Sequence, residues 1–379
     1  MSAHNKKFLY AIAALVGTMV GVGIFGLPFA FSKAGFWVGM SFLLGLTLST
    51  MLVDLMYGEV VLRTHDKHQL MGYTRKYLGA TYQKMVFFAA TLTGYVGLLA
   101  YIIISGDFLS TLLSPFFYTP LGTYSILFGV IMSFVALKGI KTISRVELFF
   151  GSLFITVILL IFLTGFSSIN TVNFQGFNRE FFFLPYGILL FALGGLVAVP
   201  IQRQILAGQE HRLRWAVVIA VALTAALYAL FTTTVVGISG EVTTPDAVSG
   251  LYEFLGSKIT ILSALFGAFA ITTAFLMHAT VMIDMFHYDY RVKRFHAWIL
   301  VVVPPMLLFL AGIRTFVDII SLAGGVALGF EQIMIVLLYA KAKSKGDRIP
   351  EYSMNIPLWL LYLLMAVFAS GIIYFLFIH

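Results

Sequence analysis

The sequence predicts an all-α membrane protein with 11 transmembrane helices, arranged as a five-plus-five inverted repeat followed by one extra helix. Three observations predict this fold. Of the 379 residues, 60% are hydrophobic and 11% are charged, and the mean hydropathy is +0.98, which lies outside the range of soluble domains. Apolar stretches of roughly 20 residues, long enough to cross the hydrocarbon core, follow one another along the chain. Glycine and proline interrupt the first and the sixth of these stretches, so the same feature occurs at the start of each half of the chain.

Short connections join the apolar stretches, so we expect a single integral-membrane domain over residues 1–379. The longest hydrophilic connections, 64–83 and 239–257, are too short to form a second domain. We expect the first repeat at approximately 8–166 and the second at approximately 182–340, with the last span as the extra helix. The expected spans cover residues 8–31, 36–62, 84–112, 121–137, 146–166, 182–201, 214–238, 259–285, 296–312, 315–340 and 356–378.

The basic residues predict how the spans are oriented. All but four of the 24 Lys and Arg residues lie before the first span or in the connections on the same side of the membrane. The four exceptions are Lys33, Arg179, Lys258 and Arg314. By the positive-inside rule the N-terminus is cytoplasmic, and an odd number of spans then places the C-terminus outside. The net charge of +8 therefore reports topology and indicates no nucleic-acid partner.

The N-terminus and the cysteine count add two constraints. The chain has no cysteine, which excludes disulfides and thiolate metal sites and is compatible with a bacterial inner membrane. Two lysines precede the first apolar run, as in a signal peptide, but the run is long, is broken by glycine and lacks a small-residue cleavage site. We therefore interpret it as a retained first span.

The first span contains the strongest functional signal, because residues 17–28 hold four glycines and a proline at membrane depth. In hydrocarbon an unsatisfied peptide group costs several kcal/mol, so a helix is broken there only where its freed N–H and C=O groups line a cavity. A second interrupted segment, residues 185–200, lies five spans later. Five is an odd number, so the sixth span is an inverted counterpart of the first. Paired breaks of this kind indicate the binding site of a secondary transporter, although Gly and Pro also serve close packing in membrane helices.

Four segments carry a resemblance to a known family: residues 17–28, residues 191–195 with Pro200, residues 99–107 and residues 57–59. Together they resemble the amino-acid/auxin permease family of the amino acid-polyamine-organocation superfamily. The resemblance implies the leucine-transporter fold and symport of amino acids with sodium or protons, without a cofactor.

The breaks suit a zwitterionic substrate, because their backbone groups can receive both of its charges. The N–H groups of Gly21, Val22 and Gly23 start the outer half of span one, where a helix carries partial positive charge, and we expect them to hold the carboxylate. Carbonyls near Met19 and at residues 191–193 would accept from the ammonium group. Since backbone meets both charges, no charged side chain is required at the site.

For the side-chain pocket, the family pattern places span three and span six along the substrate. The glycine pair of span six permits a medium or large neutral side chain, bulky or aromatic ones included, without demanding one, and the expected function is symport of a neutral amino acid by alternating access. The tyrosines of span three can equally pack against lipid or neighbouring helices. The predicted substrate-binding residues are Met19, Gly21, Val22, Gly23, Tyr95, Tyr101, Phe191, Ala192, Leu193, Gly194 and Gly195.

The resemblance also implies a sodium site in which the hydroxyls of two adjacent threonines join three backbone carbonyls. The ligands would be Thr272, Thr273 and the carbonyls of Gly17, Val20 and Phe269, and five neutral oxygens suit a hard cation. The alternative is that both threonines bond to their own helix. No other metal site is expected.

Proton coupling is the competing mechanism, with sodium slightly favoured. Ionisable residues inside a membrane are functional candidates by default, and the candidates are Asp107, His278 and Glu331. For His278 a structural hydrogen bond is the favoured interpretation. Three other acidic residues lie toward the basic surface and are expected to pair with its arginines: Asp54, Glu59 and Asp284.

Other function classes fit less well. No cluster of His, Asp, Glu or Ser has catalytic spacing near a membrane surface, so an enzyme is not expected. A metal-ion transporter of the same fold would need charged or soft ligands in the breaks, where Met19 is the lone candidate. A transporter of another small solute ranks behind an amino-acid symporter, and the paired breaks argue against a channel or a sensor. The sequence does not determine the oligomeric state.

Overall fold

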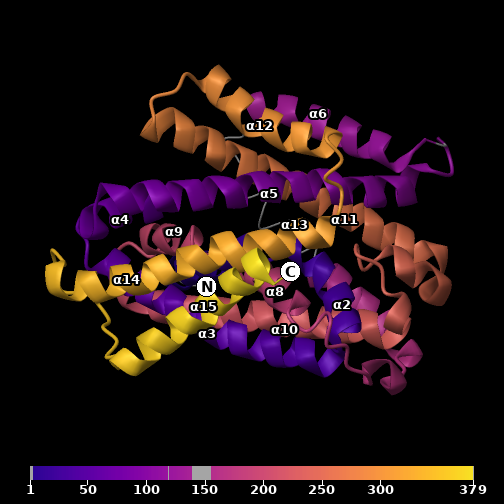
Figure 1. Cartoon of the computed structure of the whole chain (residues 1–379), viewed down its shortest axis with the longest axis horizontal. Helices are drawn as coiled ribbons and strands as arrows, with labels where there is room; N and C mark the ends of the chain where they lie inside the picture. Colours follow the sequence, from indigo (N-terminus) through magenta and orange to yellow (C-terminus); the bar gives the residue numbers. More distant parts are fainter. Residues whose placement is uncertain (1–2, 118, 139–154, 379) are drawn as a thin grey trace.

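The computed structural model describes residues 3–117, 119–138 and 155–378, and in these residues the chain is helical without any strand (Figure 1). The expected fifth span begins in residues 146–154, which lie outside the described part of the chain. The helices of the first half are α1 (Ala3–Met19), α2 (Gly23–Ala34), α3 (Phe36–Leu62), α4 (Leu70–Leu78), α5 (Ala80–Leu113) and α6 (Leu121–Lys138).

The second half repeats this pattern of long helices with one interruption. Its helices are α8 (Leu184–Ala192), α9 (Ala198–Ile205), α10 (Leu213–Ser239), α11 (Tyr252–Asp284), α12 (Arg294–Leu310), α13 (Phe316–Leu322), α14 (Gly329–Lys345) and α15 (Leu358–Phe377). A π-helical segment, Ala323–Leu328, joins α13 to α14 without a break in the span. Inside α11, Gly256 takes a φ of 73°, which kinks the helix near its start.

Within the described residues, 6 helices are long and apolar enough to cross a membrane, and the bent pair α1 and α2 forms a further span. Three shorter apolar helices, Leu121–Leu137, Ile155–Ser168 and Arg294–Leu310, lie where other spans are expected. The α8 and α9 pair coincides with the expected sixth span. The all-helical membrane architecture is confirmed, whereas the total of 11 spans stays a prediction.

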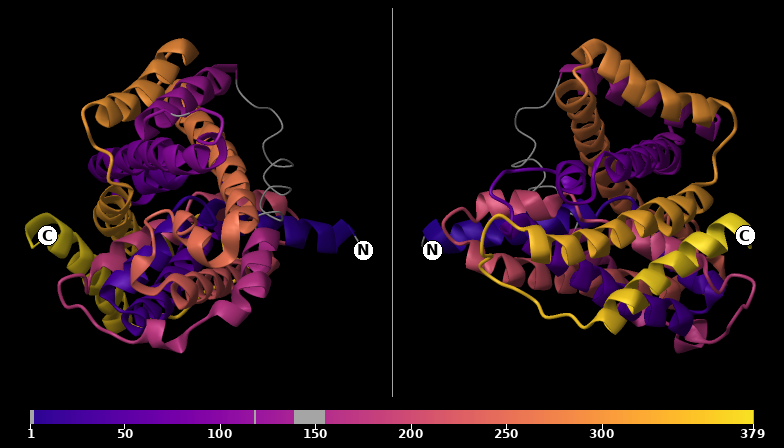
Figure 2. Two further views of the ribbon diagram at one scale, coloured as in Figure 1. Left: turned by 90° about the vertical axis from the view of Figure 1, so that its right-hand side faces the viewer. Right: turned by 60° about the vertical axis from the view of Figure 1, so that its left-hand side comes forward.

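The helices form two sets. In one set α1, α2, α3, α8, α9 and α10 pack together around the two broken spans, and in the other α5, α6, α11 and α12 pack against one another. Figure 2 shows α6 and α12 standing apart from the broken helices, with α5 between them. The broken spans therefore lie among the helices of the first set, and α2 meets α5 through the rings of Phe25 and Phe108, whose centroids are 4.9 Å apart.

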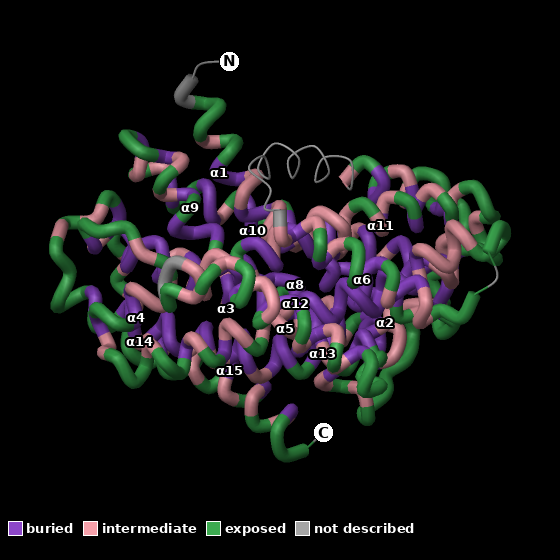
Figure 3. Tube along the Cα trace, turned by 90° about the horizontal axis from the view of Figure 1, so that it is seen from above, coloured by how far each residue is buried: buried purple, intermediate pink, exposed green. Residues whose placement is uncertain are grey.

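Burial follows the same arrangement. Buried residues concentrate along the middle of the molecule, around α5, α8 and α13, and exposed residues lie at its rim (Figure 3). Large apolar side chains are exposed on the outer helix surfaces, including Trp37, Leu44, Phe88 and Phe134. Lipid covers such side chains in a transmembrane bundle, where no hydrophobic effect drives them inward.

Acidic side chains near the ends of α3 and α11 form ion pairs with arginines. Glu59 pairs with Arg63 at 2.7 Å and also accepts from the Met354 N–H at 2.7 Å. Asp284 pairs with Arg294 at 3.1 Å. The predicted arginine pairing is thus confirmed for Glu59 and Asp284.

For Asp54 that prediction is wrong. Its carboxylate is 1% exposed, and its Oδ2 has no hydrogen-bond partner among the described residues. Asp54 precedes Glu59 by five residues, which places it about 7.5 Å further from the charged end of α3. The arginines at that end do not reach it.

Candidate functional site

The first broken span is confirmed. Helix α1 ends at Met19 and α2 begins at Gly23, with 56° between their directions. Between them the Gly21 N–H donates to the Met19 carbonyl at 2.8 Å. Among the described residues, the N–H groups of Val22 and Gly23 meet no acceptor, so two of the three predicted donors stay free at the positive end of α2.

The sixth span is also broken where expected. Helix α8 ends at Ala192, α9 begins at Ala198, and residues 193–197 between them are not helical. The Gly194 N–H bonds back to the Phe191 carbonyl at 3.2 Å, which closes the end of α8. The Ala192 carbonyl points out of the helix and accepts from a side chain of another span.

The two breaks touch each other through glycine. A Cβ placed on Gly23 would lie 2.8 Å from the Ala192 Cα, and one on Gly195 would lie 2.7 Å from the Met19 Cε. Only residues without a side chain allow backbones to approach this closely. The start of α2 and the end of α8 therefore form one crossing, with free N–H groups and a carbonyl end side by side.

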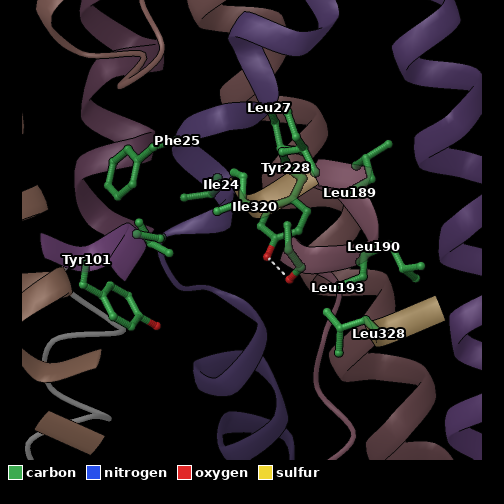
Figure 4. Packing of buried hydrophobic residues seen from close by; sticks show 14 of the residues in the cluster. Ile24, Phe25, Leu27, Tyr101, Leu189, Leu190, Leu193, Tyr228, Ile320 and Leu328 are labelled. Atoms are coloured by element: carbon green, nitrogen blue, oxygen red, sulfur yellow. Dashed lines mark hydrogen bonds between the residues drawn. The ribbon is translucent and has the colours of Figure 1, made fainter. Parts of the chain in front are cut away.

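A residue that the sequence analysis missed connects the two breaks. Tyr228 in α10 is buried, and its hydroxyl lies 2.7 Å from the Met19 carbonyl oxygen and 2.7 Å from the Ala192 carbonyl oxygen. Figure 4 shows its ring between the two broken spans, with a hydrogen bond from the hydroxyl. Nothing in the sequence signals this tyrosine, because it is one of 18 in the chain and lies within a uniformly apolar span.

Aromatic side chains border the crossing on its α5 side. The Tyr101 hydroxyl would lie 3.7 Å from a Cβ on Gly21, and apart from the neighbouring residues of the break no other described residue would come within 4 Å of that Cβ. Beyond the break, the Phe25 ring packs edge-on against Phe108, with centroids 4.9 Å apart, and lies 6.3 Å from Phe231. Tyr101 and Phe25 appear together on this side in Figure 4.

Residues 4–375 match the sequence model of the tryptophan/tyrosine permease family. The chain belongs to this family. Among curated proteins none matches the permease. Among solved structures, the permease resembles MhsT, crystallised in complex with L-phenylalanine, with a TM-score of 0.62 and 16% identity, covering 97% of each chain. This similarity confirms the leucine-transporter fold.

Of the two tyrosines predicted for the pocket, only Tyr101 lies at the crossing. The Tyr95 hydroxyl donates to the Leu300 carbonyl of α12 at 2.8 Å, on a different side of α5. Six helical residues amount to about 600° of rotation, so the two side chains point about 120° apart. One helix face cannot hold both.

Of the predicted ion ligands, the Thr273 hydroxyl and the Phe269 carbonyl lie 3.3 Å apart in α11. Thr272 donates to the Ala268 carbonyl at 2.7 Å and Thr273 to the Ala270 carbonyl at 2.9 Å, both within α11. The helices that pack on α11 are chiefly α5, α6 and α12. Gly17, another predicted ligand, lies near the end of α1, which packs on α9 and α10. A hydroxyl that donates its hydrogen keeps lone pairs that can bind a cation, so the sodium site stays a prediction.

The three ionisable candidates occupy different places. The His278 ring lies beside Tyr101, with centroids 6.2 Å apart, and the Glu331 carboxyl is buried in the first turn of α14, with Oε1 unpartnered among the described residues. Asp107 lies in the last two turns of α5. Their role in proton transfer stays a prediction.

Proposed function

We propose that this permease carries an aromatic amino acid across the membrane by alternating access, in symport with a cation. The observation that carries the proposal is the crossing of the two breaks, where the free N–H groups of Val22 and Gly23 lie beside the carbonyl end of α8 at Ala192. The family name points to tryptophan and tyrosine, and the related MhsT binds L-phenylalanine. The finer placement among amino-acid/auxin permeases is part of this proposal.

The crossing suits an amino acid because it offers both kinds of backbone group. Moving a carboxylate and an ammonium group out of water is costly unless each finds partners that are already oriented. The carboxylate would accept from Val22 and Gly23 at the start of α2, where the helix dipole adds favourable charge. The ammonium group would lie against the carbonyl ends of the two breaks, at Met19 and Ala192.

The aromatic ring would lie on the α5 side of the crossing, over Gly21. Tyr101 approaches that glycine, and Phe25 lies two residues beyond Gly23. Edge-to-face contacts between rings are worth about 0.5–1.5 kcal/mol beyond the area they bury. These contacts would favour an aromatic substrate over an aliphatic one of equal size.

Sodium is the favoured coupling ion, with the proton as the alternative. One Na⁺ moving inward with a zwitterion carries one net charge, which is worth about 2.3 kcal/mol per 100 mV. In the proton alternative, Glu331 is the leading carrier, because its buried carboxyl has an unpartnered oxygen among the described residues. The basic residues support a cytoplasmic N-terminus and an inner-membrane location.

Uptake into proteoliposomes tests this function. Labelled L-tryptophan, L-tyrosine, L-phenylalanine and L-leucine are offered under an inward Na⁺ gradient, an inward proton gradient or no gradient, with protein-free liposomes as the control. We expect the aromatic amino acids to accumulate, L-leucine to lag behind them, and the Na⁺ gradient to increase uptake. Accumulation under a proton gradient alone selects the alternative ion, and absence of aromatic uptake under every condition rejects the function.

A further inference from the structure

The hydroxyl of Tyr228 serves two carbonyl oxygens with a single hydrogen. It lies 2.7 Å from both the Met19 and the Ala192 carbonyl oxygens, and a phenol can donate to only one acceptor at a time. The Met19 carbonyl also accepts from the Gly21 N–H at 2.8 Å. Among the described residues, Tyr228 is the one donor to the Ala192 carbonyl. When the hydrogen points to Met19, the Ala192 oxygen has no donor.

A buried carbonyl without a donor is unfavourable, so in the empty site the hydrogen belongs on Ala192, because Met19 already has the Gly21 N–H. A ligand that donates to Ala192 would free the hydroxyl hydrogen to turn to Met19. The ring of Tyr228 is fully buried, which holds the hydroxyl in place between the two breaks. A water molecule could supply a hydrogen, but an ammonium group supplies three and adds a positive charge. The proposed position of the ammonium group depends on these two carbonyls, at Met19 and Ala192.

We propose that Tyr228 is a positioning residue that completes the ammonium subsite, an inference that rests on the proposed transport of amino acids. Its hydroxyl donates to the Met19 carbonyl and turns a lone pair toward the bound ammonium group. The ammonium group donates to Ala192 and to the Tyr228 oxygen. Tyr228 thereby fixes the spacing of the two breaks and makes the site selective for a protonated amine.

The selectivity separates this role from a purely structural one. An α-hydroxy acid with the same ring and carboxylate has a single hydrogen and no charge at the position of the amine. Tyr228→Phe removes the oxygen that faces the amine and leaves the N–H groups of Val22 and Gly23 in place. Binding of the amino acid should therefore suffer more than binding of the hydroxy acid.

Tyr186 provides a matched control. It is also a buried tyrosine, and its hydroxyl donates to the Val367 carbonyl of α15 at 3.0 Å. Tyr186→Phe removes one buried hydrogen bond between helices but leaves the crossing unchanged. A loss of general stability should therefore be similar in the two variants.

The experiment measures binding of L-tryptophan and of indole-3-lactate to the purified full-length protein, by competition with labelled L-tryptophan, together with melting temperatures. The wild type should prefer the amino acid by at least tenfold. Tyr228→Phe should weaken L-tryptophan by about tenfold or more, the effect of losing a hydrogen bond to a charged group, and indole-3-lactate by less than about twofold. Tyr186→Phe should leave both ligands within about twofold of wild type.

Several results would overturn the inference. Equal weakening of both ligands in Tyr228→Phe, or unchanged binding of L-tryptophan, rejects it while the transport function stands. A Tyr228→Phe protein that melts far below Tyr186→Phe and binds neither ligand assigns Tyr228 a structural role. A wild type that does not prefer the amino acid over the hydroxy acid excludes an ammonium subsite at this position. If the wild type binds no aromatic amino acid at all, the proposed function fails and the inference fails with it.

Discussion

The crossing of the two breaks and the middle of α11 both carry polar groups within apolar spans, but the hydrogen bonds of these groups differ. At the crossing, Tyr228 of α10 reaches the carbonyls of two other spans, at Met19 and Ala192. In α11, the hydroxyls of Thr272 and Thr273 donate to carbonyls of their own helix. The first kind of bond ties helices together, and the second kind does not.

This difference has a consequence for transport. Bonds between helices fix the relative positions of the broken spans, so the substrate groups are preorganised before any ligand arrives. Bonds inside α11 persist whatever its neighbours do, and they leave the hydroxyl lone pairs available. A cation that bridges α1 and α11 would therefore supply the missing connection, and it would shift the conformational equilibrium by its difference in affinity between the two states.

Gly23→Val should have the largest effect on the protein, because it adds three carbon atoms where the breaks touch. The new Cβ would lie 2.8 Å from the Ala192 Cα, and backbone cannot yield as a flexible side chain does. Overpacking usually costs about 1–3 kcal/mol, and we expect at least about 3 kcal/mol here because backbone must shift. Melting temperature and the yield of monodisperse protein measure this loss. A stable Gly23→Val protein would mean that the breaks are not in contact.

The same substitution two residues earlier should act on binding instead of folding. Among the described residues beyond its chain neighbours, a Cβ on Gly21 would meet only the Tyr101 oxygen, at 3.7 Å. Gly21→Val should therefore keep its stability within about 1 kcal/mol of wild type. Its side chain would fill the space over the break. We expect the affinity for an aromatic amino acid to fall about 100-fold, which equals roughly 3 kcal/mol. Normal affinity in a well-folded variant would contradict the placement of the substrate.

Hydropathy and the glycine pattern predicted much of this fold. The helical spans, the break after Met19 and the break after Ala192 follow from apolar length and from glycines placed where a membrane helix should be continuous. These are local properties of the chain. A break depends on a few neighbouring residues, and the sequence contains them all.

The contacts between distant spans could not be predicted in the same way. Tyr228 looks like any tyrosine of an apolar span, and only the packing of α10 against α1 and α2 brings its hydroxyl to the carbonyls of Met19 and Ala192. Tyr95 and Tyr101 look equivalent in sequence, yet the rotation of α5 sends Tyr95 to Leu300. The residue that faces a site depends on helix rotation and packing, which a single sequence leaves undetermined.

The mildest prediction concerns α11. Thr273→Ala removes one neutral oxygen from the proposed sodium ligands, and the remaining ligands are unchanged. We expect the Na⁺ concentration for half-maximal transport to rise about tenfold, or roughly 1.4 kcal/mol, so that Na⁺-driven uptake falls at physiological concentrations. Initial rates of uptake across a series of Na⁺ concentrations measure this shift.

Thr280→Ala is the control for that prediction, because Thr280 lies in the same helix and donates to the Leu276 carbonyl at 2.7 Å in the same way. It removes an equivalent bond inside α11 without touching a proposed ligand. If Thr273→Ala and Thr280→Ala shift the Na⁺ response equally, or neither shifts it, the hydroxyl of Thr273 is not an ion ligand. The crossing and α11 would then differ in packing alone. A buried carboxyl such as Glu331 would become the candidate for coupling, since ionisable groups inside a membrane are functional candidates by default.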